Sequence, residues 1–351
     1  MKRFSAIGVM SGSSLDGLDI SFGTYQNSLG KWTYEHKAGA TIPFSNSLID
    51  KLKDCRNLSG LELQKLDIKL GQWIGAQIKI FVENQGETPD LIGSHGHTVF
   101  HNPGEGYTVQ IGNGQAIASQ SGLLTINNFR LEDVLKGGQG APLVPIGDVH
   151  LFNEYDAWLN LGGIANATVR AGERILAWDI CPANQVLNHL AELSGKSYDK
   201  GGVLAKSGKI ISKAIDKWSR HTYYQQSPPR SMSNEWVTRE VIDQLPDSNP
   251  ADLSASFCRF VADQMALQLK EFAPKKMLVT GGGAYHSFLI DQIKLAMPAT
   301  KIEIPNPEII DFKEAITFGL LGVLRNIGEN NVLAEVTGAS SDSCSGNFFY
   351  P

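Results

Sequence analysis

Residues 5–24 read Ser-Ala-Ile-Gly-Val-Met-Ser-Gly-Ser-Ser-Leu-Asp-Gly-Leu-Asp-Ile-Ser-Phe-Gly-Thr. Apolar residues dominate 5–10 and 18–24, and the segment between them, 11–17, is rich in Gly, Ser and Asp. Those residue types tolerate tight backbone geometry, so the pattern predicts two strands joined by a glycine turn. A third strand is predicted at 31–36.

A long helix follows in the first half of the chain. Apolar residues recur three or four positions apart between residues 63 and 81, a spacing that gathers them on one helix face. Short strands are predicted at 90–94, 107–111 and 123–127. The stretch 136–142, Lys-Gly-Gly-Gln-Gly-Ala-Pro, is rich in residues that break regular structure and predicts a domain junction.

The second half shows the same order of features. Strands are predicted at 157–161, 164–170 and 175–179, helices at 184–193, 203–218, 235–245 and 253–272, and a strand at 277–280 before the next helix. Each half therefore begins with strand, glycine turn and strand. We expect an α/β fold of two lobes, 1–135 and 136–351, with the last helix free to pack back on the first lobe. Ligands collect between domains, so a central cleft is the expected site.

Composition narrows the function. The 351 residues include 31 basic and 36 acidic side chains, a net charge of −5, and 42% are hydrophobic. This balance is typical of a chain that buries a core, and it offers little attraction for nucleic acid. We find neither the apolar run of ~18 residues that spans a membrane nor a secretory signal, and we expect a cytoplasmic protein with no membrane partner. A homodimer is compatible with the sequence.

The cysteines argue against two common frameworks. The chain has four of them, far apart in the sequence and without a Cys-x-x-Cys pair. Neither a zinc ribbon nor a disulfide scaffold is therefore indicated.

The turn at 11–17 is a candidate phosphate site. Backbone N–H groups freed by glycine, together with hydroxyl groups, can cradle phosphate oxygens, and a carboxylate can hold Mg²⁺ directly or through its waters. The residues concerned are Ser11, Gly12, Ser13, Ser14, Asp16 and Gly17, with Asp16 as the candidate metal ligand. Taken alone, the segment is more typical of an ordinary hairpin turn, and it is no Walker loop because a strand follows it instead of a helix.

Two further glycine turns lie in the second half. Gly162-Gly163 separates two predicted strands and could close on the phosphates of a nucleotide. Gly281-Gly282-Gly283 follows an apolar strand, where an adenine or ribose could lie flat against backbone without a Cβ in the way. Each turn alone also suits a purely structural role.

Charged and imidazole side chains supply the candidate chemistry. Asp179 ends a predicted strand and could act as a general base, although a helix cap or turn residue is an alternative. Arg130 offers a fork suited to a carboxylate, with a structural ion pair to Asp133 as the alternative. His95, His97 and His101 would share a face in a strand; we expect hydrogen bonding to a ligand or neighbouring loop rather than a metal cluster.

Together these segments resemble the anhydro-N-acetylmuramic acid kinase family over nearly the whole chain. The resemblance rests on long strings in the family's order: Gly8–Gly17, His95–His101, Phe129-Arg-x-x-Asp133, Gly137–Pro145, Asn160–Asn166, Gly281–Gly283 and Val336–Ser340. It implies the actin, hexokinase and Hsp70 type of fold, two ribonuclease-H-like lobes with ATP and Mg²⁺ between them.

The resemblance also implies the reaction and the roles. The family opens the 1,6-anhydro bridge of an amino sugar with water and phosphorylates the released O6 with ATP. Asp179 would deprotonate the water, and the three glycine turns with Mg²⁺ would hold the phosphates. The residues that would contact the sugar are His95, Arg130, Glu314 and Asn184.

Some positions depart from the family's pattern. The family reads Asp-Thr-Gly-Pro-Gly-Asn where this chain has Asp179-Ile-Cys-Pro-Ala-Asn184, and His97, Ser13 and Tyr285-His286 also differ. Losing two glycines removes positive-φ conformations and should add bulk beside the base. Three other readings stay open: a related kinase for a different sugar or sugar acid, a nucleotide-binding module without catalysis, and a metal-dependent hydrolase built on the three histidines.

Overall fold

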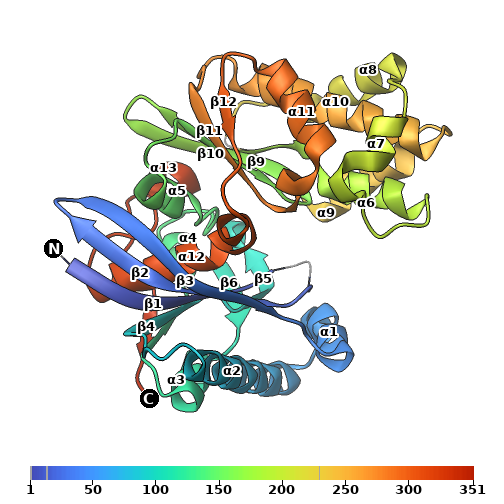
Figure 1. Ribbon diagram of the computed structural model, residues 1–351. Helices are drawn as coiled ribbons and strands as arrows, with labels where there is room; N and C mark the ends of the chain where they lie inside the picture. The colour runs from blue at the N-terminus through green and yellow to red at the C-terminus, as the bar shows by residue number, and fades with distance from the viewer. Residues whose placement is uncertain (1, 13–14, 229) are drawn as a thin grey trace. The chain divides into compact units, whose positions relative to one another are not determined.

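The computed structural model describes residues 2–12, 15–228 and 230–351 (Figure 1). It divides into two compact units, Met1–Asn153 with Phe312–Pro351, and Glu154–Asp311. Each unit carries its own mixed β-sheet.

The first unit is built on a six-stranded sheet of order β13-β7-β4-β1-β2-β3. Strand β1 is antiparallel to β2 and β2 to β3, whereas β4 and β7 run parallel to β1. A separate hairpin pairs β5 with β6. The strands are β1 Lys2–Ser11, β2 Leu18–Ser28, β3 Lys31–Ile42, β4 Leu91–Ser94, β5 His97–Asn102, β6 Tyr107–Ile111, β7 Thr125–Asn127 and β13 Asn347–Phe349.

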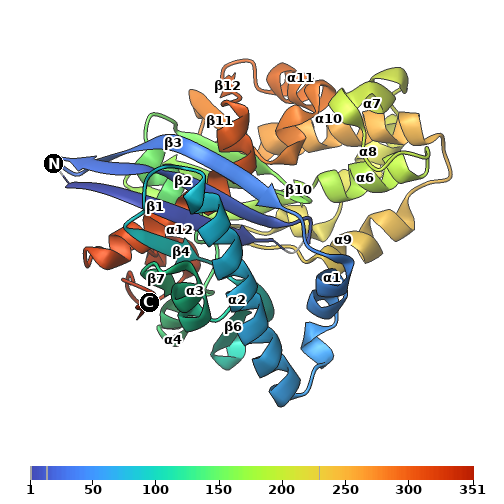
Figure 2. The ribbon, with the colours of Figure 1, turned by 60° about the horizontal axis from the view of Figure 1, so that its bottom comes forward.

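Helices cover both faces of this sheet (Figures 1 and 2). They are α1 Asn46–Lys53, α2 Gly60–Glu83, α3 Gly114–Ser121, α4 Leu131–Leu135, α5 Pro145–Leu151, α12 Pro307–Asn326 and α13 Ala334–Thr337. Of α12, the residues from Phe312 on belong to this unit. Helix α2 begins with a capping box, in which the Ser59 hydroxyl accepts from the Glu62 N–H and the Glu62 carboxylate accepts from the Ser59 N–H.

The alternation of side chains along β1 explains the two layers. Ile7 and Val9 point to one face, where they join the core that α2 completes. Gly8 points to the other face, where a Cβ would lie 1.7 Å from the Ala315 carbonyl oxygen of α12. Glycine therefore lets the α12 backbone rest directly on the sheet, with α2 on the opposite face (Figure 1).

The second unit repeats this arrangement. Its sheet has the order β10-β9-β8-β11-β12, with β9 antiparallel to β8 and β10, and β11 and β12 parallel to β8. The first three strands form a meander and the next two add parallel on its other side, as in the first unit. The strands are β8 Ala157–Leu161, β9 Ile164–Ala171, β10 Arg174–Pro182, β11 Lys276–Thr280 and β12 Lys301–Glu303.

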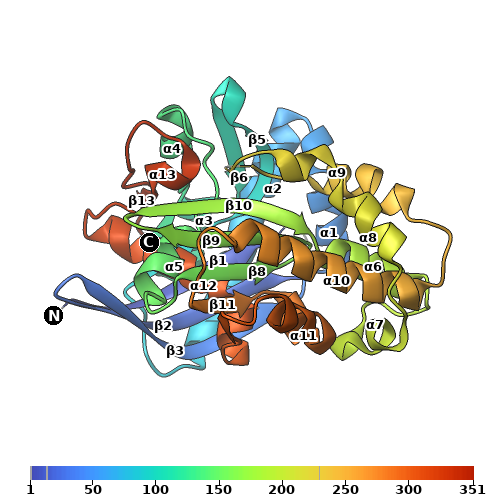
Figure 3. The same cartoon turned by 90° about the horizontal axis from the view of Figure 1, so that it is seen from above.

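A helical layer packs on this second sheet, with α10 running along it (Figure 3). The helices are α6 Asn184–Glu192, α7 Val203–Ser207, α8 Ser212–Ser219, α9 Asn234–Glu240, α10 Pro250–Leu269 and α11 Ser287–Ala296. The single helix predicted at 203–218 is therefore wrong. It is interrupted at Gly208, where a Cβ would lie 2.0 Å from the Ala251 carbonyl oxygen of α10.

The repeated strand order confirms the predicted α/β class with two ribonuclease-H-like lobes. The first unit extends past the predicted boundary at 135/136, because α5 contacts β3 and its Asp148 accepts a hydrogen bond from Lys313 of α12 at 2.9 Å. Among the described residues, no helix combines the length and apolar character that crossing a membrane requires.

Candidate active site

The turn at 11–17 joins β1 to β2. Ser11 is buried, and its hydroxyl lies 3.4 Å from Nδ1 of His97. Gly17 is also buried, and a Cβ there would lie 2.7 Å from the Ile42 carbonyl oxygen. Asp16 is exposed and accepts no hydrogen bond from a described residue. The predicted phosphate ligands Ser13 and Ser14 lie outside the described residues, and Gly12, which borders them, is half-buried.

The glycine turns of the second unit divide into two kinds. Gly281 has φ of 79°, and a Cβ there would lie 2.3 Å from Asn160 Oδ1, so its own fold requires glycine. At Gly162, Gly163 and Gly282 the φ angle is not positive, and a Cβ would meet nothing nearer than 3.4, 3.8 and 3.6 Å. The described protein leaves room for a side chain at these three positions. The backbone there is open to a ligand.

Asn184 lies beside both glycine turns. Its side-chain Nδ2 donates to the Leu161 carbonyl oxygen at 2.8 Å, and its backbone N–H donates to Gly162 at 3.0 Å. A Cβ on Gly283 would lie 3.0 Å from Asn184 Oδ1. The carbonyl of Gly163 accepts from two further N–H groups at the start of α6, those of Ala183 and Gln185. Asn184 is thus bonded to the first turn and lies against the second.

Asp179 lies in β10 beside a β-bulge. It pairs with Asn166, whereas Cys181 pairs with Ala165, which leaves Ile180 as the extra residue. A bulge re-aims the neighbouring side chain, and bulges are common next to active sites. The Asp179 carboxylate is half-buried, and its Oδ2 accepts a hydrogen bond from the Met232 N–H at 2.7 Å.

Burial raises the pKa of this carboxylate into the range that suits a general base. Desolvation raises the pKa of Asp179 to about 6, and the hydrogen bond from Met232 acts in the opposite direction. A general base works best when its pKa lies near the operating pH. The carboxylate is therefore ionised at neutral pH and basic enough to accept a proton from water.

The residues that depart from the family's loop pattern are buried in the core of the second unit. Ile180, Cys181 and Ala183 are each 0% exposed, and φ at Ala183 is −138°. Cys181 does not have a positive φ either. The three side chains belong to the core of the second unit, and neither position where the family has glycine requires a positive φ here.

Arg130 is held by two neighbours in the first unit. Its Nε and Nη2 donate to Nε2 of His95 at 2.9 and 2.8 Å, and its Nη1 donates to the Gly140 carbonyl oxygen at 2.6 Å. The ion pair with Asp133 does not form. Asp133 accepts instead from the Gly140 N–H and the Thr337 hydroxyl, both at 2.7 Å.

His95 is buried and neutral. Its Nδ1 lies 2.9 Å from the Gly96 carbonyl oxygen, which can only accept, so Nδ1 carries the proton and Nε2 is free to accept from Arg130. Burial holds the pKa of His95 well below its usual value, and the Arg130 charge adds to the effect. Burial also lowers the pKa of Arg130 to about 10, which leaves the guanidinium charged at neutral pH.

The three histidines of the 95–101 segment do not form a metal centre. His101 Nδ1 lies 2.9 Å from the Thr108 hydroxyl, while His97 faces Ser11 and His95 faces Arg130. Over 2–12, 15–228 and 230–351, no group of three or more His, Cys, Asp or Glu could hold a metal ion. The predicted hydrogen-bonding role is confirmed for the groups that the structure describes.

Glu314 lies on α12 within electrostatic reach of Arg130. Burial raises the pKa of Glu314, and the charges of Lys313 and Arg130 act against that rise. The side chain is half-buried and accepts no hydrogen bond from a described residue. Arg130, His95 and Glu314, all predicted to contact the sugar, therefore belong to one cluster of the first unit.

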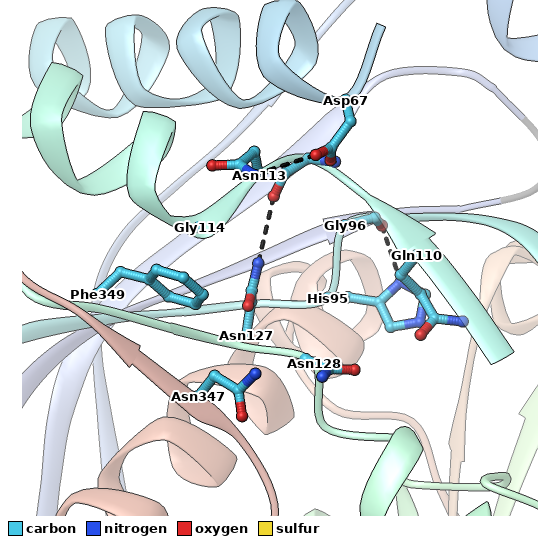
Figure 4. Close-up of a pocket in the computed structure, with 11 residues that line it drawn as sticks. Asp67, His95, Gly96, Gln110, Asn113, Gly114, Asn127, Asn128, Asn347 and Phe349 are labelled. Carbon is cyan, nitrogen blue, oxygen red and sulfur yellow. Dashed lines mark hydrogen bonds between the residues drawn. The ribbon is translucent and has the colours of Figure 1, made fainter. Parts of the chain in front are cut away.

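A polar cavity of about 160 Å³ lies against His95 in the first unit (Figure 4). Asparagine side chains of β7 and β13 and of the connecting loops line it, together with Asp67 of α2. Asp67 accepts from the Gly112 N–H at 2.8 Å and from the Asn113 amide at 3.1 Å, which fixes one wall. The volume lies below the ~300 to 1,000 Å³ typical of whole-ligand pockets, so it suits one polar substituent.

The residues around Asp179 carry no signal in the amino-acid sequence. Tyr223 donates from its hydroxyl to the Asp179 carbonyl oxygen at 2.8 Å, and the Asp179 N–H donates to the Arg230 carbonyl oxygen at 3.0 Å. These residues lie more than forty positions from Asp179 and match no motif. The asparagines of the cavity were not predicted either, although the Asn127-Asn128 pair at the end of a predicted strand was a signal available in the sequence.

Comparisons with known proteins agree over the whole chain. A family model described as anhydro-N-acetylmuramic acid kinase matches residues 4–351. A protein of that name from Synechococcus elongatus is 32% identical over 373 residues and covers 98% of each chain. One from a Sulfurovum species is 30% identical and covers 99% of this chain and all of the relative.

Solved structures resemble the chain only distantly. A hexokinase of the ROK type from Thermus thermophilus aligns with a TM-score of 0.40 at 15% identity, over 91% of this chain and 99% of its own. That score is too low to add to the assignment, which rests on the sequence matches. By the full-length match of the family model and by relatives at 30% identity or more, the chain belongs to the anhydro-N-acetylmuramic acid kinase family.

Proposed function

We propose that this kinase uses ATP and water to open 1,6-anhydro-N-acetylmuramic acid and to phosphorylate its O6, giving N-acetylmuramate 6-phosphate. The half-buried Asp179 carboxylate carries the proposal. Its pKa of about 6 suits a general base at neutral pH, and one side of it is already held by a backbone N–H.

One carboxylate suffices for this reaction. Asp179 takes a proton from water as the water oxygen bonds to the anomeric carbon, and the bond from that carbon to O6 breaks. O6 forms a bond to the γ-phosphorus, and the bond from that phosphorus to the oxygen of ADP breaks. A glycosidase needs a second carboxyl group to protonate the leaving oxygen. Here the phosphoryl group takes that place.

The nucleotide site is proposed at the glycine turns. Gly162, Gly163 and Gly282 leave backbone open to phosphate, ribose or base, and Gly281 and Gly283 set the path of the second turn. In the first unit we assign the phosphate contacts to the turn of Ser11, Gly12, Ser13, Ser14 and Gly17.

Asp16 is suited to hold Mg²⁺. It is an exposed carboxylate with no hydrogen-bond donor among the described residues, and oxygen ligands are those that Mg²⁺ prefers. When bound, the ion would neutralise charge on the phosphates. Protein residues alone supply the base and the sugar contacts.

The sugar site is proposed at the cluster of His95, Arg130 and Glu314. Three of the five N–H groups of Arg130 donate to His95 and Gly140. The remaining two can bind a carboxylate such as that of the sugar's lactyl group. Glu314 has no described donor and is available to sugar hydroxyls. The cavity beside His95 suits the acetamido substituent, whose amide matches its asparagine lining. Asn184 is retained as a substrate contact.

Product identification tests the proposal. The purified chain is incubated with anhydro-N-acetylmuramic acid, ATP and Mg²⁺ in ¹⁸O-water, and the product is examined by mass spectrometry. We expect phosphate on O6 and label at the anomeric oxygen. Asp179→Asn should remove turnover and leave ATP binding intact, whereas Asp216→Asn, an exposed carboxylate of α8, should change neither.

Other outcomes would reassign the chain. Phosphorylation of a different sugar or sugar acid, with none of this product, would favour a kinase of another substrate. ATP binding without turnover of any sugar would favour a nucleotide-binding module. Unaltered turnover in Asp179→Asn would remove Asp179 from the mechanism.

A further inference from the structure

A short segment of the second unit closes around the Asp179 backbone. The Tyr223 hydroxyl donates to the Asp179 carbonyl oxygen at 2.8 Å, the Asp179 N–H donates to the Arg230 carbonyl oxygen at 3.0 Å, and the Met232 N–H donates to the Asp179 carboxylate at 2.7 Å. The C=O, the N–H and the carboxylate of one residue are thus held by Tyr223, Arg230 and Met232, respectively.

Side chains tie this segment to the helical layer. The Arg230 guanidinium lies over the Tyr223 ring, 4.9 Å from its centroid, and donates to the Gln226 carbonyl oxygen and to Gln268 Oε1 of α10. Cation–π contact of this kind fixes the ring as well as the charge. The Tyr223 hydroxyl is therefore oriented before any ligand binds.

Gln268 holds the strand on both sides of Asp179. Its Oε1 accepts from Trp178 Nε1 at 3.0 Å, and its Nε2 donates to the Ile180 carbonyl oxygen at 3.1 Å. Ile180 is the extra residue of the bulge and lacks a partner across β9, so Gln268 replaces part of the missing strand pairing. Residues 178, 179 and 180 are each fixed by a group outside the sheet.

We propose that Tyr223, Arg230, Met232 and Gln268 form a positioning clamp for Asp179, in which the Tyr223 hydroxyl sets the orientation of the general base. The inference rests on the proposed function, because it requires Asp179 to be that base. None of the four touches the reacting atoms in this assignment; they act through Asp179. A misplacement of about 1 Å in a reacting group can lower the rate about a hundredfold.

The clamp also bears on the acidity of the base. Its Met232 N–H lowers the pKa of Asp179 against the effect of burial. The titratable groups that interact around this site are Cys181 on the same strand and Tyr223 and Arg230 from the clamp, while α10 contributes the neutral Gln268. Burial raises the pKa of Cys181 and of Tyr223, so Asp179 is the group that titrates near neutrality.

Neighbouring tyrosines give a matched test. Tyr223→Phe removes the hydroxyl bonded to Asp179, whereas Tyr224→Phe removes a hydroxyl whose ring packs on Phe260 and which has no described hydrogen-bond partner. We expect kcat to fall about tenfold in Tyr223→Phe, with KM for the sugar and ATP affinity unchanged within twofold. We also expect the acidic limb of its pH profile to move to higher pH, because a loosened segment weakens the Met232 bond. Tyr224→Phe should match the wild type.

Two further variants distinguish loss of the clamp from misfolding and from failure of the proposed function. Arg230→Met removes a buried Nε donor without a described acceptor, should fold, and should reproduce the lower kcat and the shifted limb. If Asp179→Asn is inactive but Tyr223→Phe equals Tyr224→Phe in kcat and limb, the clamp is overturned alone. A fall in melting temperature of Tyr223→Phe with the pH limb unmoved also overturns it. Turnover retained in Asp179→Asn overturns the proposed function instead.

Discussion

Two donors of Arg130, Nε and Nη2, converge on a single acceptor, Nε2 of His95, at 2.9 and 2.8 Å. This is possible only because the Gly96 carbonyl oxygen holds the His95 proton on Nδ1. His95 thus acts as a fixed acceptor that orients the Arg130 guanidinium and leaves its opposite edge free to bind a ligand. A protonated His95 would repel Arg130, and burial prevents that state.

His95→Ala should weaken sugar binding. Arg130 would keep only its bond to Gly140 and lose the anchor that orients it, and a hydrogen bond to a charged group contributes about 1.5 to 3 kcal/mol. We expect KM for the sugar to rise at least tenfold, measured by steady-state kinetics at saturating ATP. His189→Ala on α6 is the control. An unchanged KM would show that Arg130 does not bind the sugar.

Catalysis should depend on the ionisation of Asp179. With a pKa of about 6, the carboxylate is protonated and inactive as a base below that pH and ionised above it. We expect kcat/KM to rise through a limb centred near pH 6 and to level off above pH 7, measured from pH 5 to 8.5. A limb near pH 4, the value of an ordinary aspartate, would contradict the environment described for this residue.

The same burial should destabilise the fold at neutral pH. The folded pKa, about 6, lies above the unfolded value of about 3.8, so the folded state binds the proton more tightly, and stability falls as pH rises between those values. Asp179→Asn should therefore raise the free energy of unfolding at pH 8, on the order of 1 to 3 kcal/mol. Below pH 4 the difference should vanish. Urea unfolding at pH 4 and pH 8 measures it, and identical pH dependence of both proteins would contradict it.

Alanine at two glycine positions should separate binding from folding. Gly162→Ala meets nothing nearer than 3.4 Å, so its melting temperature should equal the wild type, while ATP affinity falls severalfold because the Cβ occupies the proposed phosphate contact. Gly281→Ala needs a positive φ and meets Asn160 Oδ1 at 2.3 Å, so it should lose at least about 1 kcal/mol of stability. Calorimetric titration of ATP analogue and thermal unfolding give the two readouts. Unchanged nucleotide affinity in Gly162→Ala would move the nucleotide site elsewhere.

Removing one partner of the buried ion pair in the first unit should lower the free energy of unfolding. Lys313 Nζ and Asp148 Oδ1 lie 2.9 Å apart, with side chains only 5% and 2% exposed. Lys313→Met leaves an uncompensated carboxylate and should cost about 3 to 5 kcal/mol of unfolding free energy, whereas the double variant Lys313→Met/Asp148→Asn should recover most of it. Denaturant unfolding of the single and double variants measures the coupling. Additive losses would mean that the two charges do not stabilise each other.

Local patterns predicted the elements well where one periodicity dominated. The strand at 157–161 matches β8, and the helix spacing at 63–81 falls within α2. The prediction of one helix at 203–218 failed for a tertiary reason: the backbone at Gly208 is extended where the α10 backbone approaches it. The apolar spacing on either side of Gly208 cannot reveal that contact.

The duplicated α/β order, the three glycine turns and the family could be read from the amino-acid sequence, because they depend on residues adjacent in the chain. Three features became visible only in the folded chain: Arg130 bonds to His95 rather than Asp133, the altered residues after Asp179 are buried, and Tyr223 and Met232 hold Asp179. Hydrogen bonds between distant residues and the burial that shifts a pKa arise from packing. Neither has a counterpart in the spacing of residues along a chain.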